Sequence, residues 1–248
     1  MADALHLVRD DDQPAGPSAS RFLAALPAQS RARLESELEP LELNARTVIW
    51  EPDVPIKSVY FPHNCAMSII VPLKGHVSVE AGTVGREGFL GVPVLLGCDV
   101  TKTQAIVQVS GKASRLPASV FRRAVAEDTP LRDFCLRYTQ ALLEQTSQSV
   151  ACNGRHDLSE RCARWMLMTR DRLDGDEFHL THEFLATMLG VRRATVTVAA
   201  AILQRAGFIR YSRGKVVILD REGLENASCE CYQVVRQMYD RLLGSAAS

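Results

Sequence analysis

The sequence has no excess of charge of either sign and no long apolar run. Its 29 basic and 29 acidic side chains balance over 248 residues, so overall charge says nothing about a nucleic-acid partner. No apolar stretch approaches the roughly 20 residues that span a bilayer, which argues against a transmembrane helix. The first twenty residues contain an acidic cluster at 10–12 and no apolar signal core. We therefore expect a cytoplasmic protein.

The sequence also lacks the clustered cysteines that an iron–sulfur centre uses. Seven cysteines are an odd number in a chain of this size, so reduced thiols fit better than a disulfide framework. Cys229 and Cys231 are expected on one helix, where two residues correspond to about 200° of rotation and one metal ion cannot be shared. The other five are too far apart for an iron–sulfur centre. We predict that all seven cysteines are small buried side chains and that they bind no metal. The five cysteines other than Cys229 and Cys231 are Cys65, Cys98, Cys135, Cys152 and Cys162.

Residues 43–116 contain short β-rich segments between turn signals. Many short strands at even spacing are typical of an antiparallel barrel or sandwich. Short helices are expected before this region, at 21–38, and after it, at 119–126. The expected strands are residues 47–50, 58–61, 67–71, 77–81, 105–109 and 112–116.

A longer helix is predicted over residues 130–153. Leu131, Phe134, Tyr138 and Leu142 form an apolar stripe at alternating three- and four-residue spacing. The stripe has no obvious partner inside a β-barrel, so a helix–helix dimer seam is the favoured interpretation; packing on its own domain is the alternative. Asn153 and Gly154 are expected to break this helix and form a hinge.

Residues 180–215 carry the pattern of a helix-turn-helix with a basic hairpin behind it. Thr181 is an N-cap for a first helix, Gly190 supplies a turn with positive φ, and Val196 anchors a second helix over residues 192–205. From residue 192 to 219 there are six basic residues and no acidic one, which is the electrostatic footprint of a phosphate-binding surface. These are Arg192, Arg193, Arg205, Arg210, Arg213 and Lys215.

Helices are expected on both sides of this module. Asp157 and Glu160 form a capping box that opens a helix through Met168. After the hairpin, Asp220 caps a single last helix with an apolar stripe from Leu224 to Leu242.

The order of these parts, with the motif LTHEFLATMLGVRRATVTVAAAILQRAGFIRYSRGKVVIL, resembles the Crp/Fnr family of bacterial transcription regulators. The resemblance implies an α+β chain with an N-terminal antiparallel β-roll or jelly-roll barrel, a long dimerisation helix and a C-terminal winged helix-turn-helix domain. It further implies a homodimer that binds palindromic double-stranded DNA under the control of a signal at the β-roll, with RNA polymerase as a further partner. The expected divisions are a disordered tail at 1–19, a cyclic-nucleotide-binding-like sensor at 20–126, the dimerisation helix and hinge at 127–154, and the DNA-binding domain at 155–248.

The same resemblance assigns DNA contacts to individual residues. Arg193 matches a family position that reads a guanine. Ala194 and Val198 stand where the best-known pattern has a glutamate and a second arginine, so the preferred DNA sequence must differ or depend more on other side chains of this helix. Those side chains are Arg192, Thr195 and Thr197. Thr181 fits the phosphate-contacting helix start, and Arg213 and Lys215 fit the wing.

The sensor matches less well. The stretch GREGFLGVPVLLG resembles the family's glycine-rich turn, yet Val92 stands where cyclic-nucleotide binders have a glutamate, and residues 103–104 replace their Arg-Ser pair. Because a buried phosphate without a guanidinium is uncompensated, ordinary cyclic AMP binding is not expected. One weak match remains: Thr146 and Ser147 fall at positions whose hydroxyls contact adenine in nucleotide-responsive members.

Two alternatives stay open: a constitutive DNA-binding dimer with a ligand-free β-roll, and a cupin-type metalloenzyme fused to a DNA-binding tail. Only His63 and His76 lie in the predicted barrel, without a tight histidine pair, and neither a Gly-x-Ser-x-Gly elbow nor a Walker loop is present. Haem ligation by these histidines or Cys65 is not supported either. We therefore predict no enzyme activity and no cofactor.

Overall fold

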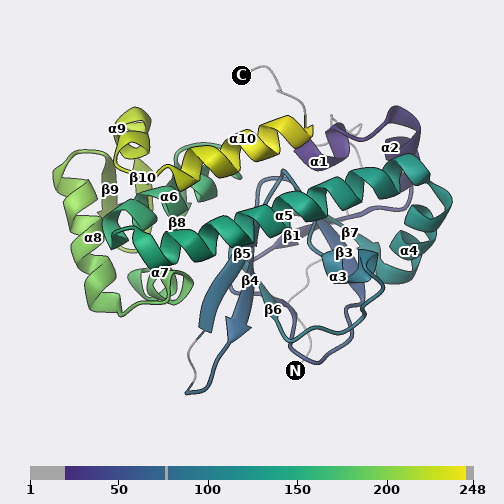
Figure 1. The fold of residues 1–248 in the computed structure, drawn as a ribbon, viewed down its shortest axis with the longest axis horizontal. Helices are drawn as coiled ribbons and strands as arrows, with labels where there is room; N and C mark the ends of the chain where they lie inside the picture. Colours follow the sequence, from purple (N-terminus) through teal and green to yellow (C-terminus); the bar gives the residue numbers. More distant parts are fainter. Residues whose placement is uncertain (1–19, 76–77, 244–248) are drawn as a thin grey trace.

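The computed structural model describes residues 20–75 and 78–243 and confirms the predicted α+β architecture. A β-roll lies beneath one long helix, and a smaller helical module lies at one end of that helix (Figure 1). The tail expected at residues 1–19 and His76 lie outside the described residues.

The β-roll consists of two antiparallel sheets with strand orders β1-β7-β3 and β2-β6-β4-β5. All six strands expected from the sequence are present. The sequence did not indicate β1, because its segment Glu-Pro-Leu-Glu-Leu combines a proline with glutamates; as an edge strand it pairs only with β7 and tolerates both. The strands are β1 (Glu39–Leu43), β2 (Val48–Trp50), β3 (Ser58–Pro62), β4 (Ala66–Pro72), β5 (Ser78–Val84), β6 (Gln104–Val109) and β7 (Gly111–Pro117).

An aromatic cluster fills the space between the roll and its helices. The Phe22 ring lies 5.2 Å from Phe89, 5.0 Å from Phe134 and 5.5 Å from Tyr138, between ring centroids. Such aromatic pairs add about 0.5–1.5 kcal/mol each beyond area burial. The short helices around this core are α1 (Arg21–Ala24), α2 (Ala28–Glu35), α3 (Val92–Leu95) and α4 (Ala118–Glu127).

The long helix α5 (Thr129–Arg155) continues beyond the predicted hinge. Its start is capped by Asp128, whose side chain accepts a hydrogen bond from the Leu131 backbone amide at 3.0 Å. Asn153 and Gly154 remain helical, and the chain leaves the helix only at His156. An interior glycine costs a helix only about 1 kcal/mol relative to alanine, so the hinge prediction at 153–154 is wrong by two residues.

The stripe predicted as a dimer seam is part of the chain's own core. All four side chains of the stripe are less than 9% exposed: Leu131, Phe134, Tyr138 and Leu142. They lie on the inner face of α5, where they pack on the β-roll and α1, and not on the face that points to solvent. This placement of the seam is therefore corrected. A different face of α5 carries exposed apolar side chains, with Leu136 44%, Leu143 59% and Val150 70% exposed.

The C-terminal module begins with the predicted capping box, in which the Asp157 backbone amide donates to the Glu160 carboxylate at 2.9 Å. The predicted cap at Asp220 is also present. The single last helix, however, is two helices separated by residues 227–230. The second, α10, lies back along α5 (Figure 1). The elements are α6 (Leu158–Arg170), β8 (Glu177–His179), α7 (His182–Leu189), α8 (Arg193–Arg205), β9 (Ile209–Ser212), β10 (Lys215–Ile218), α9 (Arg221–Asn226) and α10 (Cys231–Leu243).

Buried polar contacts join this module to the β-roll. Arg172, which follows α6, forms an ion pair with Glu87 at 2.7 Å, and both side chains are less than 8% exposed. The Trp165 indole donates to Glu80 at 3.1 Å. Burial raises the pKa of this glutamate, although hydrogen bonds from its neighbours oppose the effect. The two parts of the chain thus share an interface with buried polar contacts.

Candidate nucleic-acid interface

The helix-turn-helix has the geometry that its sequence predicts. Helices α7 and α8 cross at 105°, within the range typical of this motif. The turn depends on Gly190, which adopts a left-handed conformation with φ 66°. At the other end of α7, the Thr181 hydroxyl accepts a hydrogen bond from the Phe184 amide at 3.1 Å, which confirms the predicted N-cap.

The N-terminal half of α8 presents the predicted base-reading side chains to solvent. Arg192, Arg193 and Thr195 are exposed, whereas Val196 is fully buried against the module's core. Ala194 and Val198, which depart from the best-known pattern, are exposed as well. Since α8 begins at Arg193, these side chains surround the positive end of the helix dipole.

Thr197 is exposed, but its hydroxyl already has partners within the chain. It donates to the Arg193 carbonyl at 3.1 Å and lies 3.0 Å from Nδ1 of His182. The His182 ring in turn stacks on Tyr211 of β9, with ring centroids 4.2 Å apart. Thr197 therefore fixes α8 relative to α7 and the wing.

The wing is the β9–β10 hairpin. Its turn places Arg213 and Gly214 at positive φ values of 51° and 75°, as a two-residue type I′ turn requires. Arg213 is exposed at the tip and, within the described ranges, has no carboxylate at ion-pair distance; the same holds for Arg192 and Arg193. Lys215, by contrast, lies 2.5 Å from Glu177 of β8. Arg192, Arg193 and Arg213 are thus unpaired among the described residues, whereas the charge of Lys215 is partly neutralised by Glu177.

The β4–β5 hairpin of the roll reaches this surface, a contact that sequence patterns do not indicate. A hollow of about 400 Å³ separates Ser78 of β5 from the turn between α7 and α8. Val79 is close enough to Gly190 that a Cβ atom there would touch its methyl groups at 3.4 and 3.5 Å. The β-roll therefore contacts the helix-turn-helix directly at its turn.

The two residues predicted as a weak effector site, Thr146 and Ser147, form hydrogen bonds within their own helix. Thr146 donates to the Leu142 carbonyl and Ser147 to the Leu143 carbonyl, each at 2.9 Å. The glycine-rich turn nearby accommodates the chain's own side chains: a Cβ at Gly85 would overlap Arg172, and one at Gly88 would overlap Tyr138.

Across residues 20–75 and 78–243, no single helix is long and apolar enough to cross a membrane. The bent pair α7 and α8 passes such a test by length and composition only. These are the two helices of the DNA-binding motif described above.

Residues 160–227 match the sequence model of the Crp-like helix-turn-helix domain family. Among curated proteins, none matches the sequence significantly. Solved structures do match. FixK2 from Bradyrhizobium japonicum superimposes with a TM-score of 0.64 at 17% identity, covering 77% of this chain and 98% of that one. A putative Crp/Fnr-family regulator from Eubacterium rectale gives a TM-score of 0.63 at 15% identity, covering 82% of this chain and 94% of that one.

A CRP-family transcriptional regulator from Thermus thermophilus has a TM-score of 0.62 at 17% identity, covering 84% of this chain and 98% of that one. Such likenesses establish the fold, and the family match establishes the DNA-binding part. Residues 160–227 are thus a Crp-like helix-turn-helix domain, set within a chain that has the fold of Crp/Fnr transcription regulators.

Proposed function

We propose that the chain is a sequence-specific DNA-binding transcription regulator, rather than an enzyme, that acts as a homodimer on a palindromic site. The observation that carries this proposal is the exposed N-terminal half of α8, where Arg192, Arg193 and Thr195 lie beside a basic wing. In helix-turn-helix proteins the second helix enters the major groove with its N-terminal residues at the base edges. Arg213 at the wing tip and Thr181 at the start of α7 would contact phosphates.

The exposed side chains of α8 suggest which bases are read. Arg193 can bond a guanine through both of its terminal nitrogens, a pair that contributes about 1–3 kcal/mol of discrimination. Ala194 and Val198 offer methyl groups, and Val198 is 60% exposed. Apolar side chains at such positions contact the methyl group of thymine. We therefore expect a half-site with one guanine flanked by A·T pairs.

A second face of α5 supports the homodimer. Leu136, Leu143 and Val150 are exposed and spaced seven residues apart, which is the repeat by which paired helices form a seam. A two-fold axis along this face would place the same three side chains of each chain opposite one another. This seam replaces the one predicted from the buried stripe.

The side chains packed on the glycine-rich turn argue against ordinary cyclic AMP binding by the β-roll. Arg172 and Tyr138 occupy the space beside Gly85 and Gly88. Two possibilities follow: a different signal displaces these side chains, or the roll acts as a scaffold of a constitutive regulator. Titration of the purified protein with cyclic nucleotides, with and without DNA, tests the first possibility for this class of ligand, because a change in DNA affinity would show that the β-roll responds to it.

Replacing Arg193 with alanine is expected to relax specificity at one base position in each half-site. The loss corresponds to about 1–3 kcal/mol per guanine contact, whereas non-specific affinity should change little. The preferred site is first selected from a random pool at fixed salt, and binding to it and to its single-base variants is then measured by fluorescence anisotropy.

Arg123→Ala provides a matched control, since Arg123 is an exposed arginine of α4 on the β-roll. It should leave both affinity and selectivity intact. Unchanged selectivity in the Arg193 variant would rule out the proposed position of α8 in the groove.

A further inference from the structure

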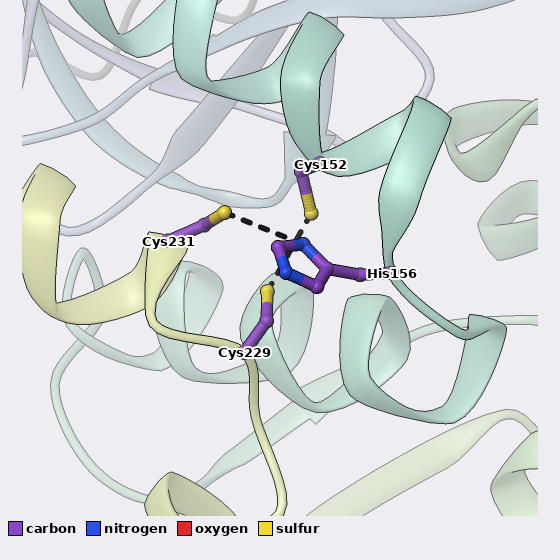
Figure 2. Close-up of side chains that lie close together, drawn as sticks. All are labelled: Cys152, His156, Cys229 and Cys231. Atoms are coloured by element: carbon purple, nitrogen blue, oxygen red, sulfur yellow. Dashed lines mark hydrogen bonds between the residues drawn. The ribbon is translucent and has the colours of Figure 1, made fainter.

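Four potential metal ligands converge where the last turn of α5 meets the start of α10 (Figure 2). Cys152 and His156 are four residues apart and therefore project from one face of the helix end. Cys229 precedes α10, and Cys231 is its first residue. The Sγ atoms of Cys152 and Cys229 are 3.5 Å apart, as are Sγ of Cys231 and Nδ1 of His156. All four ligand atoms lie within 4.8 Å of one another.

The break between α9 and α10 makes this convergence possible. The sequence-based expectation placed Cys229 and Cys231 on one helix, pointing in different directions. In the structure residues 227–230 leave the helix, so Cys229 turns toward the same point as Cys231. The geometric objection to a shared metal is therefore removed.

We propose that Cys152, His156, Cys229 and Cys231 bind one zinc ion in tetrahedral coordination. Zn–S bonds of about 2.3 Å and Zn–N bonds of about 2.0 Å place neighbouring ligand atoms roughly 3.5–3.8 Å apart, which agrees with the two distances of 3.5 Å. A mixed set of three thiolates and one imidazole favours zinc over harder cations. An iron–sulfur cluster would need more widely separated thiolates, because its own iron and sulfide atoms lie between them.

The surroundings supply the outer-shell contacts that zinc ligands need. His156 directs Nδ1 toward the thiols and Nε2 toward the Glu230 carboxylate, 3.2 Å away. A ligating histidine commonly donates its second ring N–H to a carboxylate in this way, which fixes the tautomer. The Gln148 side-chain amide donates to Sγ of Cys231 at 3.0 Å, a contact that stabilises a thiolate.

Two arginines provide compensating charge, since three thiolates and one Zn²⁺ leave a net charge of about −1. The Nε atoms of Arg161 and Arg164, both on α6, are buried without a hydrogen-bond partner. Both guanidinium groups lie close enough to Cys152 to interact with it electrostatically.

A zinc ion here would have a structural role. It would join the end of α5 to the start of α10, beside the connection through which α5 continues into α6 and the DNA-binding module. Both helices already pack on each other, and the three cysteines form a small buried cluster of their own. Closing this long loop with a metal stabilises the folded state, because the unfolded chain binds the ion far more weakly.

The test uses the full chain, reduced and freed of metal under anaerobic conditions, and titrates it with Co²⁺. Tetrahedral cobalt with thiolate ligands gives intense visible bands and a sulfur-to-metal charge-transfer band. Both are expected to saturate at one ion per chain and to vanish on addition of one equivalent of Zn²⁺. Elemental analysis of the protein as purified should likewise give about one zinc per chain, and the melting temperature should fall when the zinc is removed.

Variants separate the site from the chain's other thiols. Cys229→Ser combined with Cys231→Ser should abolish the cobalt bands, and Glu230→Gln should weaken metal binding by about 10–100-fold. Cys98→Ser, at an exposed cysteine, should bind as the parent does. Because the double variant could misfold, the titration of the unaltered chain decides by itself. Absent or weak octahedral bands, an iron–sulfur spectrum, or a Cys152–Cys229 disulfide in the protein as purified would each overturn the proposal.

Discussion

Replacing Leu136 and Leu143 together with glutamate is expected to convert the proposed dimer into a monomer. Each glutamate would face its two-fold counterpart across the seam, where like charges repel and an apolar contact is lost. The two leucines are 44% and 59% exposed, so the fold of the single chain should change little. Light scattering combined with size-exclusion chromatography measures the change in mass directly.

The same variant should bind a palindromic site far more weakly. A dimer binds its second half-site intramolecularly, which raises overall affinity by about 10²–10⁴ over one half-site. A monomer loses this gain, yet its affinity for an isolated half-site should be unchanged, because α8 is untouched. Leu96→Glu is the control, since Leu96 is 57% exposed and lies directly after α3 of the β-roll. A double variant that remains dimeric with full affinity would contradict the seam.

The DNA-binding module could be predicted in detail because its signals are local. Thr181 as a cap, Gly190 as a left-handed turn and Val196 as a buried anchor each depend on a few neighbouring residues, and the structure confirms all three. A basic hairpin is expected after the second helix, and the structure adds that its turn lies at Arg213 and Gly214. The cap and the left-handed turn depend on local backbone chemistry.

Features that depend on distant segments were predicted less well. The apolar stripe of α5 was visible, but sequence periodicity does not show which partner covers a face; Phe22, more than a hundred residues away, packs against Phe134 and Tyr138. The break before Cys231 lacks a proline or glycine and was missed for a similar reason. Cys231 approaches Cys152 and His156 only in the folded chain, because the contact depends on the path of all the residues between them.

The contact between Arg172 and Glu87 is a further long-range feature, and it leads to the largest stability effect expected. Replacing Arg172 with methionine should lower the free energy of unfolding by about 3–5 kcal/mol, because it leaves the Glu87 carboxylate buried without its counter-charge. Arg172 Nε donates to Glu87 at 2.8 Å and Nη2 donates to the Gln145 side chain at 3.2 Å. Burial disfavours the charged guanidinium, but the Glu87 carboxylate holds the pKa of Arg172 above its usual value.

Urea unfolding measured by circular dichroism, together with a second charge-neutral variant, separates the ion pair from simple packing. Glu87→Gln combined with Arg172→Met removes both charges, so it should be less destabilised than Arg172→Met alone. Arg123→Met, at an exposed arginine of α4, should stay within about 0.5 kcal/mol of the parent. If Arg172→Met behaved like Arg123→Met, the ion pair would not hold the DNA-binding module on the β-roll. A large loss relieved by the double variant would instead show that this ion pair joins the C-terminal module to the β-roll at the glycine-rich turn, where Gly85 leaves room for the arginine.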